Sequence, residues 1–165
     1  MGWHGVTMKN HTFSVQLSSV DDTAQWAARF GAVLRPGDVI LMTGDIGAGK
    51  SFLARSIIQS HQSTPEDVPS PTFTLVQTYD TDLGEVWHAD LYRLSGPDDV
   101  IELGLYDAFD TAICLIEWPD RLQDLTPQTA LNIAFSVGQA EDARTLTITA
   151  PNQDWRVRLE QVCSQ

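Results

Sequence analysis

A glycine-rich segment at residues 44–51 constrains the fold of this chain more than any other part of its sequence. It reads GDIGAGKS and matches the Walker A pattern, which has glycines at its first and sixth positions followed by lysine and serine. A continuous apolar run at residues 39–43 precedes it, and residues 51–60 after it are compatible with a helix. A buried strand, a glycine turn and a helix in this order predict an α/β fold in which helices flank a mixed sheet.

The residue types in this segment suit the binding of phosphate groups. Glycines allow the backbone to turn so that successive amides point inward, and they carry no side chain that would block a phosphate. The helix that begins near Gly49 adds the positive end of its dipole. We expect Lys50 to reach the β- and γ-phosphates of a nucleotide and Ser51 to bind Mg²⁺. The alternative is a plain glycine turn that caps a helix, although such a turn requires neither the third glycine nor the lysine.

The absence of a guanine-recognition motif argues against GTP as the nucleotide. Guanine-specific switch proteins read their base with an Asn-Lys-x-Asp motif. The chain has two lysines, Lys9 and Lys50, and neither lies in such a motif. We therefore expect ATP rather than GTP.

Two carboxylates in other strand-like runs are candidates for the chemistry. Glu117 directly follows the apolar residues 113–116, and the carboxyl ends of parallel strands meet at one edge of a sheet, where the glycine segment also lies. Glu117 is therefore expected to serve Mg²⁺, the alternative being a solvated acid at a strand end. Asp90 shares a predicted strand face with His88 and Tyr92. It could orient an attacking water or bind Mg²⁺ through water, and the alternative is a polar strand face that only bonds its neighbours.

A third candidate lies in the loop after the Walker A helix. The sequence SPTFT at residues 70–74 follows a proline-rich stretch. Loops at this point in nucleotide switch proteins sense the γ-phosphate through a hydroxyl group, and Thr72 would supply it here. The alternative is the start of a strand stiffened by Pro69 and Pro71.

Hydrophobic patterning predicts the remaining elements. Strands are expected at residues 11–18, 112–116, 130–137 and 144–149, together with an antiparallel hairpin of residues 73–79 and 85–92. One helix should begin after a Ser19 cap, and another should run from Pro97 to about Phe109. Residues 11–165 are expected to form a single domain and residues 1–10 a loose, flexible tail. Met1 and Met8 are both compatible with a translation start.

Composition argues against several classes of function. The net charge is −12, with 22 acidic and 10 basic residues, so the surface repels phosphate backbones and anionic membranes. The scattered histidines and the cysteine pair, Cys114 and Cys163, support neither a zinc site nor a disulfide framework. No apolar run approaches the roughly 20 residues that span a bilayer, and the N-terminus has no apolar signal core, so we expect a cytoplasmic protein.

Four ordered motifs, GDIGAGKS, SPTFTLVQTY, HADLYRL and LIEWPDRL, resemble those of the bacterial TsaE family, also called YjeE. The resemblance runs from about the first predicted strand to near residue 150. It implies a P-loop NTPase-like fold and an ATPase needed to form threonylcarbamoyladenosine at position 37 of tRNAs that read codons beginning with A. It also implies two partner proteins, TsaB and TsaD, which would hold the tRNA, so that this chain meets tRNA only indirectly.

The resemblance assigns roles to residues that match the family motifs. Asp90 and Glu117 would be catalytic, and Ser51 and Glu117 would bind Mg²⁺. The nucleotide would be bound by Gly44, Asp45, Gly47, Ala48, Gly49, Lys50, Ser51, Phe52, Thr72 and Trp118. Phe52 departs from the second hydroxyl residue that the family often has, so a contact by that hydroxyl is lost or moved. The N-terminus is longer than expected, and residues 20–23 and Arg144 are guesses for adenine contacts.

Two other functions remain open from the sequence. A small-molecule kinase would share the fold but needs an acceptor pocket and closing arginines, whereas the eight arginines of this chain are dispersed. A non-catalytic module would use the nucleotide only to set its shape. For an ATPase we expect slow hydrolysis by the isolated chain and stimulation by partners, because the chain lacks a clustered arginine lid.

Overall fold

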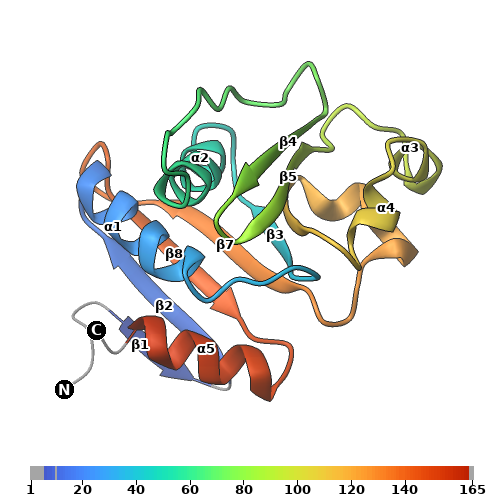
Figure 1. Ribbon diagram of the computed structural model, residues 1–165. Coiled ribbons are helices and arrows are strands. Elements are labelled where there is room, and N and C mark those ends of the chain that lie inside the picture. Colours follow the sequence, from blue (N-terminus) through green and yellow to red (C-terminus); the bar gives the residue numbers. More distant parts are fainter. Residues whose placement is uncertain (1–5, 10, 164–165) are drawn as a thin grey trace.

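The computed structural model describes residues 6–9 and 11–163. The strands are β1 (Val6–Lys9), β2 (Thr12–Leu17), β3 (Val39–Thr43), β4 (Val76–Thr81), β5 (Gly84–Asp90), β6 (Ile113–Glu117), β7 (Leu131–Val137) and β8 (Arg144–Thr149). They form one eight-stranded sheet in the order β1-β2-β8-β7-β3-β6-β5-β4 (Figure 1). The four central strands, from β7 to β5, run parallel, and antiparallel strands extend the sheet on both sides.

Helices cover both faces of this sheet (Figure 1). They are α1 (Val20–Gly31), α2 (Lys50–Ser60), α3 (Pro97–Glu102), α4 (Leu105–Ala108), α5 (Gln153–Cys163) and a 3₁₀ helix, η1 (Pro119–Leu125). Side chains alternate along β3, so Ile40 and Met42 join the apolar cluster of α1, α2 and α5, while Val39 and Leu41 join that of α3, α4 and η1. The expected α/β fold, a mixed sheet flanked by helices, is confirmed.

The start of α1 follows the local signals in the sequence. The Ser19 side chain accepts a hydrogen bond from the backbone N–H of Asp22, as the predicted cap requires. Trp26 and Phe30 then stack with their ring centroids 4.9 Å apart, and both are fully buried. Burial of side chains of this size contributes roughly 1.5–3 kcal/mol each, which fixes α1 against the sheet.

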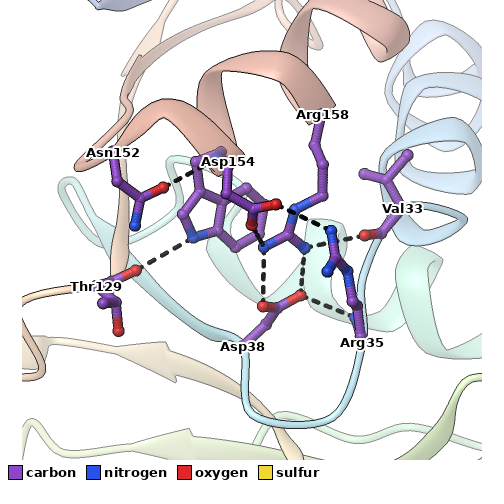
Figure 2. Close-up of polar contacts among 8 residues, drawn as sticks. Val33, Arg35, Asp38, Thr129, Asn152, Asp154 and Arg158 are labelled. Atoms are coloured by element: carbon purple, nitrogen blue, oxygen red, sulfur yellow. Dashed lines mark hydrogen bonds and ion pairs between the residues drawn. The ribbon is translucent and has the colours of Figure 1, made fainter.

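Helix α5, which the sequence analysis did not predict, is held by a cluster of charged groups (Figure 2). The Arg158 guanidinium donates hydrogen bonds of 2.6 and 3.1 Å to the Asp38 carboxylate and one of 2.7 Å to Asp154. It also lies 3.7 Å from the centroid of the Trp155 ring. Burial disfavours the charged guanidinium, but the two carboxylates outweigh that cost and hold the pKa of Arg158 above its usual value. The cluster ties α5 to the turn before β3.

Three boundaries differ from the predictions. Residues 6–9 pair with β2 as β1 instead of forming a loose tail, because they satisfy the backbone groups along the outer edge of β2; residues 1–5 and 10 lie outside the described residues. The helix predicted to reach Phe109 is broken at Gly104, whose φ of +80° does not fit a helix. The strand predicted from residue 73 begins at Val76, after a turn in which the backbone N–H of Leu75 bonds the carbonyl of Pro71.

Within the part of the chain that the structure describes, no helix combines the length and apolar character that crossing a bilayer requires.

Candidate functional site

The glycine-rich segment forms a loop between the end of β3 and the start of α2. Gly49 caps α2 in the left-handed conformation with φ +107°, which a residue with a side chain adopts only under strain. Gly44 is required for a second reason, because a Cβ atom there would lie 2.8 Å from the carbonyl oxygen of Phe135. The loop backbone therefore explains both glycines, and its last amides belong to the N-terminus of α2, where anions bind favourably.

Lys50 folds back beneath this loop. Its ammonium group donates hydrogen bonds to the carbonyl oxygens of Gly44 and, at 3.0 Å, of Asp45. It also lies 4.3 Å from the centroid of the Trp118 ring. Burial lowers the pKa of Lys50 below its usual value, although the negative charges of Glu117, Asp90 and Asp45 oppose this shift. The structure thus places the only cation in the Walker A segment against the loop backbone and the ring that follows the acid.

Arg144 holds the loop from the side of β8. Its Nε donates to the carbonyl oxygen of Ala48 at 2.9 Å, and its Nη2 donates to that of Gly47 at 3.3 Å. The sequence analysis suggested Arg144 as an adenine contact. The structure instead places its guanidinium against the backbone of the phosphate loop, although the residue also borders the cavity described below.

The two candidate carboxylates lie side by side at the ends of neighbouring parallel strands. Asp90 at the end of β5 is the direct register partner of Glu117 at the end of β6. Both residues are nearly buried, with relative exposures of 6% and 4%. Ser51, in the first turn of α2, donates a hydrogen bond of 2.7 Å to Glu117 Oε2. The structure therefore brings the predicted Mg²⁺ residues, Ser51 and Glu117, into direct contact.

Hydroxyl groups of the loop before β4 link the two acids. Ser51 Oγ lies 3.4 Å from Ser70 Oγ, and Ser70 Oγ lies 2.9 Å from Thr72 Oγ1. Thr72 then donates to Asp90 Oδ2 at 3.4 Å. The other Asp90 oxygen accepts from the backbone N–H of Tyr92 at 3.0 Å. Thr72 is thus a neighbour of Asp90, and Ser70, which had no role in the sequence analysis, completes the link.

Trp118 adopts a left-handed backbone conformation with φ +56°, which is uncommon for a residue other than glycine. This turn directly follows the acid of β6 and places the indole next to Lys50 and next to the Tyr92 ring, whose centroid is 5.0 Å away. Strained backbone of this kind clusters at functional sites. Trp118 also lines the cavity described below.

His88 is a component that the sequence analysis left without a role. It is fully buried, and its Nε2 lies 2.7 Å from Glu117 Oε2. The period-two alternation of β5 placed His88 on the face of Asp90, and this was the only signal available. Because both faces of β5 are covered, the polar side chain meets a buried acid rather than solvent.

A cavity of about 620 Å³ lies over the loop and the two acids. The predicted residues that line it are Gly47, Gly49, Lys50, Ser51, Phe52, Thr72, Asp90, Glu117 and Trp118. Gly44, Asp45 and Ala48, also predicted to bind the nucleotide, do not line it; the carbonyl groups of Gly44 and Asp45 face the Lys50 ammonium, and Ala48 is buried.

The other side of the cavity is mostly apolar. Leu17, Val20, Thr23, Phe135 and Leu146 line it. Val20 and Thr23 belong to the segment guessed from the sequence. Leu17, Phe135 and Leu146 were missed, because they come from strands far apart in the chain that only the sheet brings together. A flat apolar group with polar edges, such as a nucleobase, suits such a surface.

The site offers oxygen ligands suited to a hard cation. Among residues 6–9 and 11–163, no group of three or more His, Cys, Asp or Glu side chains could enclose a metal ion by itself. Mg²⁺ does not need such a group, because it is commonly bound by one or two carboxylates together with water and substrate phosphates. The hydroxyl of Ser51 and the carboxylates of Glu117 and Asp90 therefore fit Mg²⁺ carried with a nucleotide.

Fold and site together define an α/β protein with a Walker A loop that borders a cavity beside two buried carboxylates. Comparison with known proteins identifies the group more narrowly. The family model described as threonylcarbamoyl adenosine biosynthesis protein TsaE matches residues 17–146. The chain belongs to the TsaE family, which confirms the resemblance found in its motifs.

Individual relatives agree with this assignment. A tRNA threonylcarbamoyladenosine biosynthesis protein TsaE from Rickettsia bellii is 37% identical over 133 residues, which cover 81% of this chain and 92% of the relative. The protein of the same name from Bacillus subtilis is 32% identical over 146 residues, covering 88% of this chain and 87% of that one. The crystal structure of Bacillus subtilis YdiB superposes with a TM-score of 0.73 over 96% of each chain, at 24% identity, and so shares the fold.

Proposed function

We propose that this protein is a Mg²⁺-dependent ATPase that contributes to forming threonylcarbamoyladenosine at position 37 of tRNAs reading codons that begin with A. The observation that carries the proposal is the 2.7 Å contact between Ser51 and Glu117 beside the glycine loop. A hydroxyl from the loop helix and an acid from the adjacent strand form the pair that holds Mg²⁺ in nucleotide-hydrolysing proteins of this type. Membership of the TsaE family supports the assignment to tRNA modification.

ATP would lie with its phosphates on the loop and its base against the apolar side of the cavity. The cavity of about 620 Å³ is in the range of small-molecule sites, roughly 300–1,000 Å³. The Lys50 ammonium would exchange the carbonyl oxygens of Gly44 and Asp45 for phosphate oxygens, which are stronger acceptors because they are charged. Arg144 would keep the loop in place during this exchange, since it binds two other loop carbonyls.

Mg²⁺ bound by Ser51 and Glu117 would neutralise charge that develops on the phosphate oxygens. Asp90 would orient the attacking water and accept its proton. The backbone N–H of Tyr92 and the hydroxyl of Thr72 hold one Asp90 oxygen each, so the carboxylate has a defined orientation. Thr72 would sense the γ-phosphate through its hydroxyl group. It would couple the presence of this phosphate to the conformation of the loop before β4, because it is bonded to both Asp90 and Ser70.

Homologues of TsaB and TsaD are the proposed partners. The net charge of −12 disfavours direct binding of tRNA, so the partners would hold the tRNA while this chain binds protein. A cytoplasmic location fits this role, because tRNA modification takes place there. Partner-stimulated rather than fast intrinsic hydrolysis is expected, since of the eight arginines, all of which the structure describes, only Arg93 and Arg144 line the cavity. Arg93 lies against the Phe73 ring, and Arg144 is bonded to the loop carbonyls.

Phosphate release tests the proposal. Release of inorganic phosphate from Mg-ATP would be measured for the chain alone, with TsaB and TsaD homologues, and with both partners and tRNA. We expect slow release from the chain alone and faster release in the assembly. Transfer of phosphate to a metabolite would identify a kinase instead, and no release even in the complete assembly would identify a non-catalytic nucleotide-binding module.

A further inference from the structure

His88 is a buried polar group to which the proposed function assigns no task. It lies two residues before Asp90 on β5, with no solvent exposure. In the parallel pairing of β5 and β6, His88 is opposite Leu115 and Asp90 is opposite Glu117. His88 and Glu117 are therefore diagonal neighbours on one face of the sheet, within reach of each other's side chains.

The contact with Glu117 has a defined direction. A carboxylate only accepts hydrogen bonds, so the 2.7 Å contact between His88 Nε2 and Glu117 Oε2 requires the imidazole to donate from Nε2. His88 Nδ1 is buried and has no hydrogen-bond partner among the described residues. The ring is thus held at this position by its bond to the acid and by packing, and residues 6–9 and 11–163 provide no second polar contact to orient it.

Both hydrogen bonds that the described residues make to the Glu117 side chain end on the same oxygen. Ser51 Oγ and His88 Nε2 each bond Oε2 at 2.7 Å, one from α2 and the other from β5. Two donors on Oε2 fix the orientation of the carboxylate and leave Oε1 for a ligand in the cavity that Glu117 lines. His88 has no solvent exposure and does not line the cavity, so its donor reaches Glu117 from the interior of the sheet.

We propose that His88 is a positioning residue, which fixes the Glu117 carboxylate from the interior of the sheet so that it can serve the Mg²⁺ of a bound Mg-nucleotide. The inference rests on the proposed function. Ser51 would bind Mg²⁺ through its hydroxyl oxygen, whereas the imidazole would be the donor to Glu117 that takes no part in binding the metal. Partners that orient a metal ligand in this way contribute roughly 10–100-fold to metal affinity.

Substitutions at His88 separate positioning from simple packing. His88→Leu removes the donor, His88→Gln keeps an amide donor at a similar reach, and His88→Asn keeps an amide that is too short to reach Glu117. Val86→Ala is the matched control, because Val86 is buried two residues earlier on the same face of β5. Val86→Ala should lower the stability of the fold without altering the orientation of the Glu117 carboxylate. Binding of ATP would be measured by calorimetry in excess Mg²⁺ and in EDTA, with thermal unfolding recorded for each variant.

For His88→Leu and His88→Asn we expect the affinity for Mg-ATP to fall by about tenfold or more, while the affinity for ATP in EDTA changes less than about twofold. His88→Gln should retain most of the Mg²⁺ effect, and Val86→Ala should retain all of it. The inference would be overturned if the affinity for ATP fell equally with and without Mg²⁺, or if it fell in neither condition. It would also be overturned if His88→Gln weakened binding of Mg-ATP as much as His88→Leu. If His88→Leu fails to fold, the comparison of the asparagine and glutamine variants decides.

The same measurement distinguishes failure of the inference from failure of the proposed function. A wild-type protein that does not bind ATP, or binds it equally well with and without Mg²⁺, would contradict the proposed function and the inference together. A wild-type protein with a clear Mg²⁺ effect that survives in His88→Leu would contradict the role of His88 alone.

Discussion

Ser51 Oγ and Glu117 Oε2 lie 2.7 Å apart. Their contact joins the first turn of α2 to the end of β6, although the two residues are 66 positions apart in the sequence. The contact exists because α2 starts at the glycine loop after β3 and β6 pairs directly with β3. It places a hydroxyl and a carboxylate in the lining of the cavity, where a metal ion held by a nucleotide would need them.

Glu117→Gln should weaken binding of Mg-ATP while leaving binding of metal-free ATP nearly unchanged. The amide oxygen can still accept the bonds from Ser51 and His88, so the fold is preserved, but the charge that attracts Mg²⁺ is lost. We expect a loss of at least about tenfold, since even outer partners of metal ligands contribute that much. Titration of the protein with ATP at several Mg²⁺ concentrations checks this, and an unchanged Mg²⁺ dependence would remove Glu117 from the metal site.

Lys50→Ala should abolish most nucleotide binding. The ammonium is the only cationic side chain within the Walker A segment, and charge-assisted hydrogen bonds contribute about 1.5–3 kcal/mol, which corresponds to roughly 10–160-fold in affinity. Lys9→Ala, which changes the other lysine, is the charge control and should bind normally. Calorimetry with ATP and with GTP would also test the base preference. Wild-type protein that binds both nucleotides with equal affinity would contradict the assignment to ATP.

Asp90→Asn should retain ATP binding and lose most hydrolysis. Asparagine can keep the contact with the backbone N–H of Tyr92 but cannot accept a proton from water. A positioned acid or base contributes roughly 10²–10⁴-fold, so the rate of phosphate release in the partner complex should fall by at least about a hundredfold. Full turnover by this variant would show that Asp90 only supports the loop before β4.

Arg158→Ala should destabilise the protein without changing its nucleotide affinity at temperatures where it is folded. The substitution leaves the Asp38 carboxylate nearly buried and unpaired, and breaking a buried pair in this way costs about 3–5 kcal/mol. Asp154→Asn should cost much less, because Asp154 is half exposed. Urea unfolding of both variants tests the difference, and similar midpoints would show that the cluster in Figure 2 does not hold α5.

The Asp154 carboxylate also predicts a dependence on pH. The hydrogen bond from Arg158 is the main cause that lowers the pKa of Asp154 below its usual 3.8. Its contribution to stability is therefore complete above the unfolded-state pKa and is lost as the pH falls through the lower folded-state value. Asp154→Asn should remove this part of the acid dependence in urea unfolding at pH 2–5, and an acid dependence equal to that of the wild-type protein would contradict the prediction.

Both cysteines should be unreactive in the folded protein. Burial raises the pKa of the Cys114 thiol to about 12 and that of Cys163 to about 11, so neither forms appreciable thiolate at neutral pH. A thiol-specific reagent at pH 8 should modify no cysteine before unfolding and both after it. Above pH 9 the unfolded chain loses these protons more readily than the folded one, so this contribution to stability should decrease as the pH rises.

Local rules made several parts of the structure predictable. Positive φ at Gly49, the cap at Ser19 and the two-faced apolar run of β3 each depend on residues within a few positions of one another. Glu117 was predictable as well, because an acid directly after a buried strand lies where strand ends meet. The broken helix at Gly104 shows the limit of this reasoning, since a glycine is compatible with several conformations until its surroundings select one.

The sequence by itself determined the strand, loop and helix that form the candidate phosphate site, because their geometry follows from glycine conformations and from side-chain alternation over short distances. Only the tertiary structure decided what surrounds it. The bonds from His88 to Glu117, from Arg144 to the loop and from Arg158 to Asp38 join residues 29, 96 and 120 positions apart. Such contacts depend on strand register and on the packing of whole elements, which no local pattern specifies.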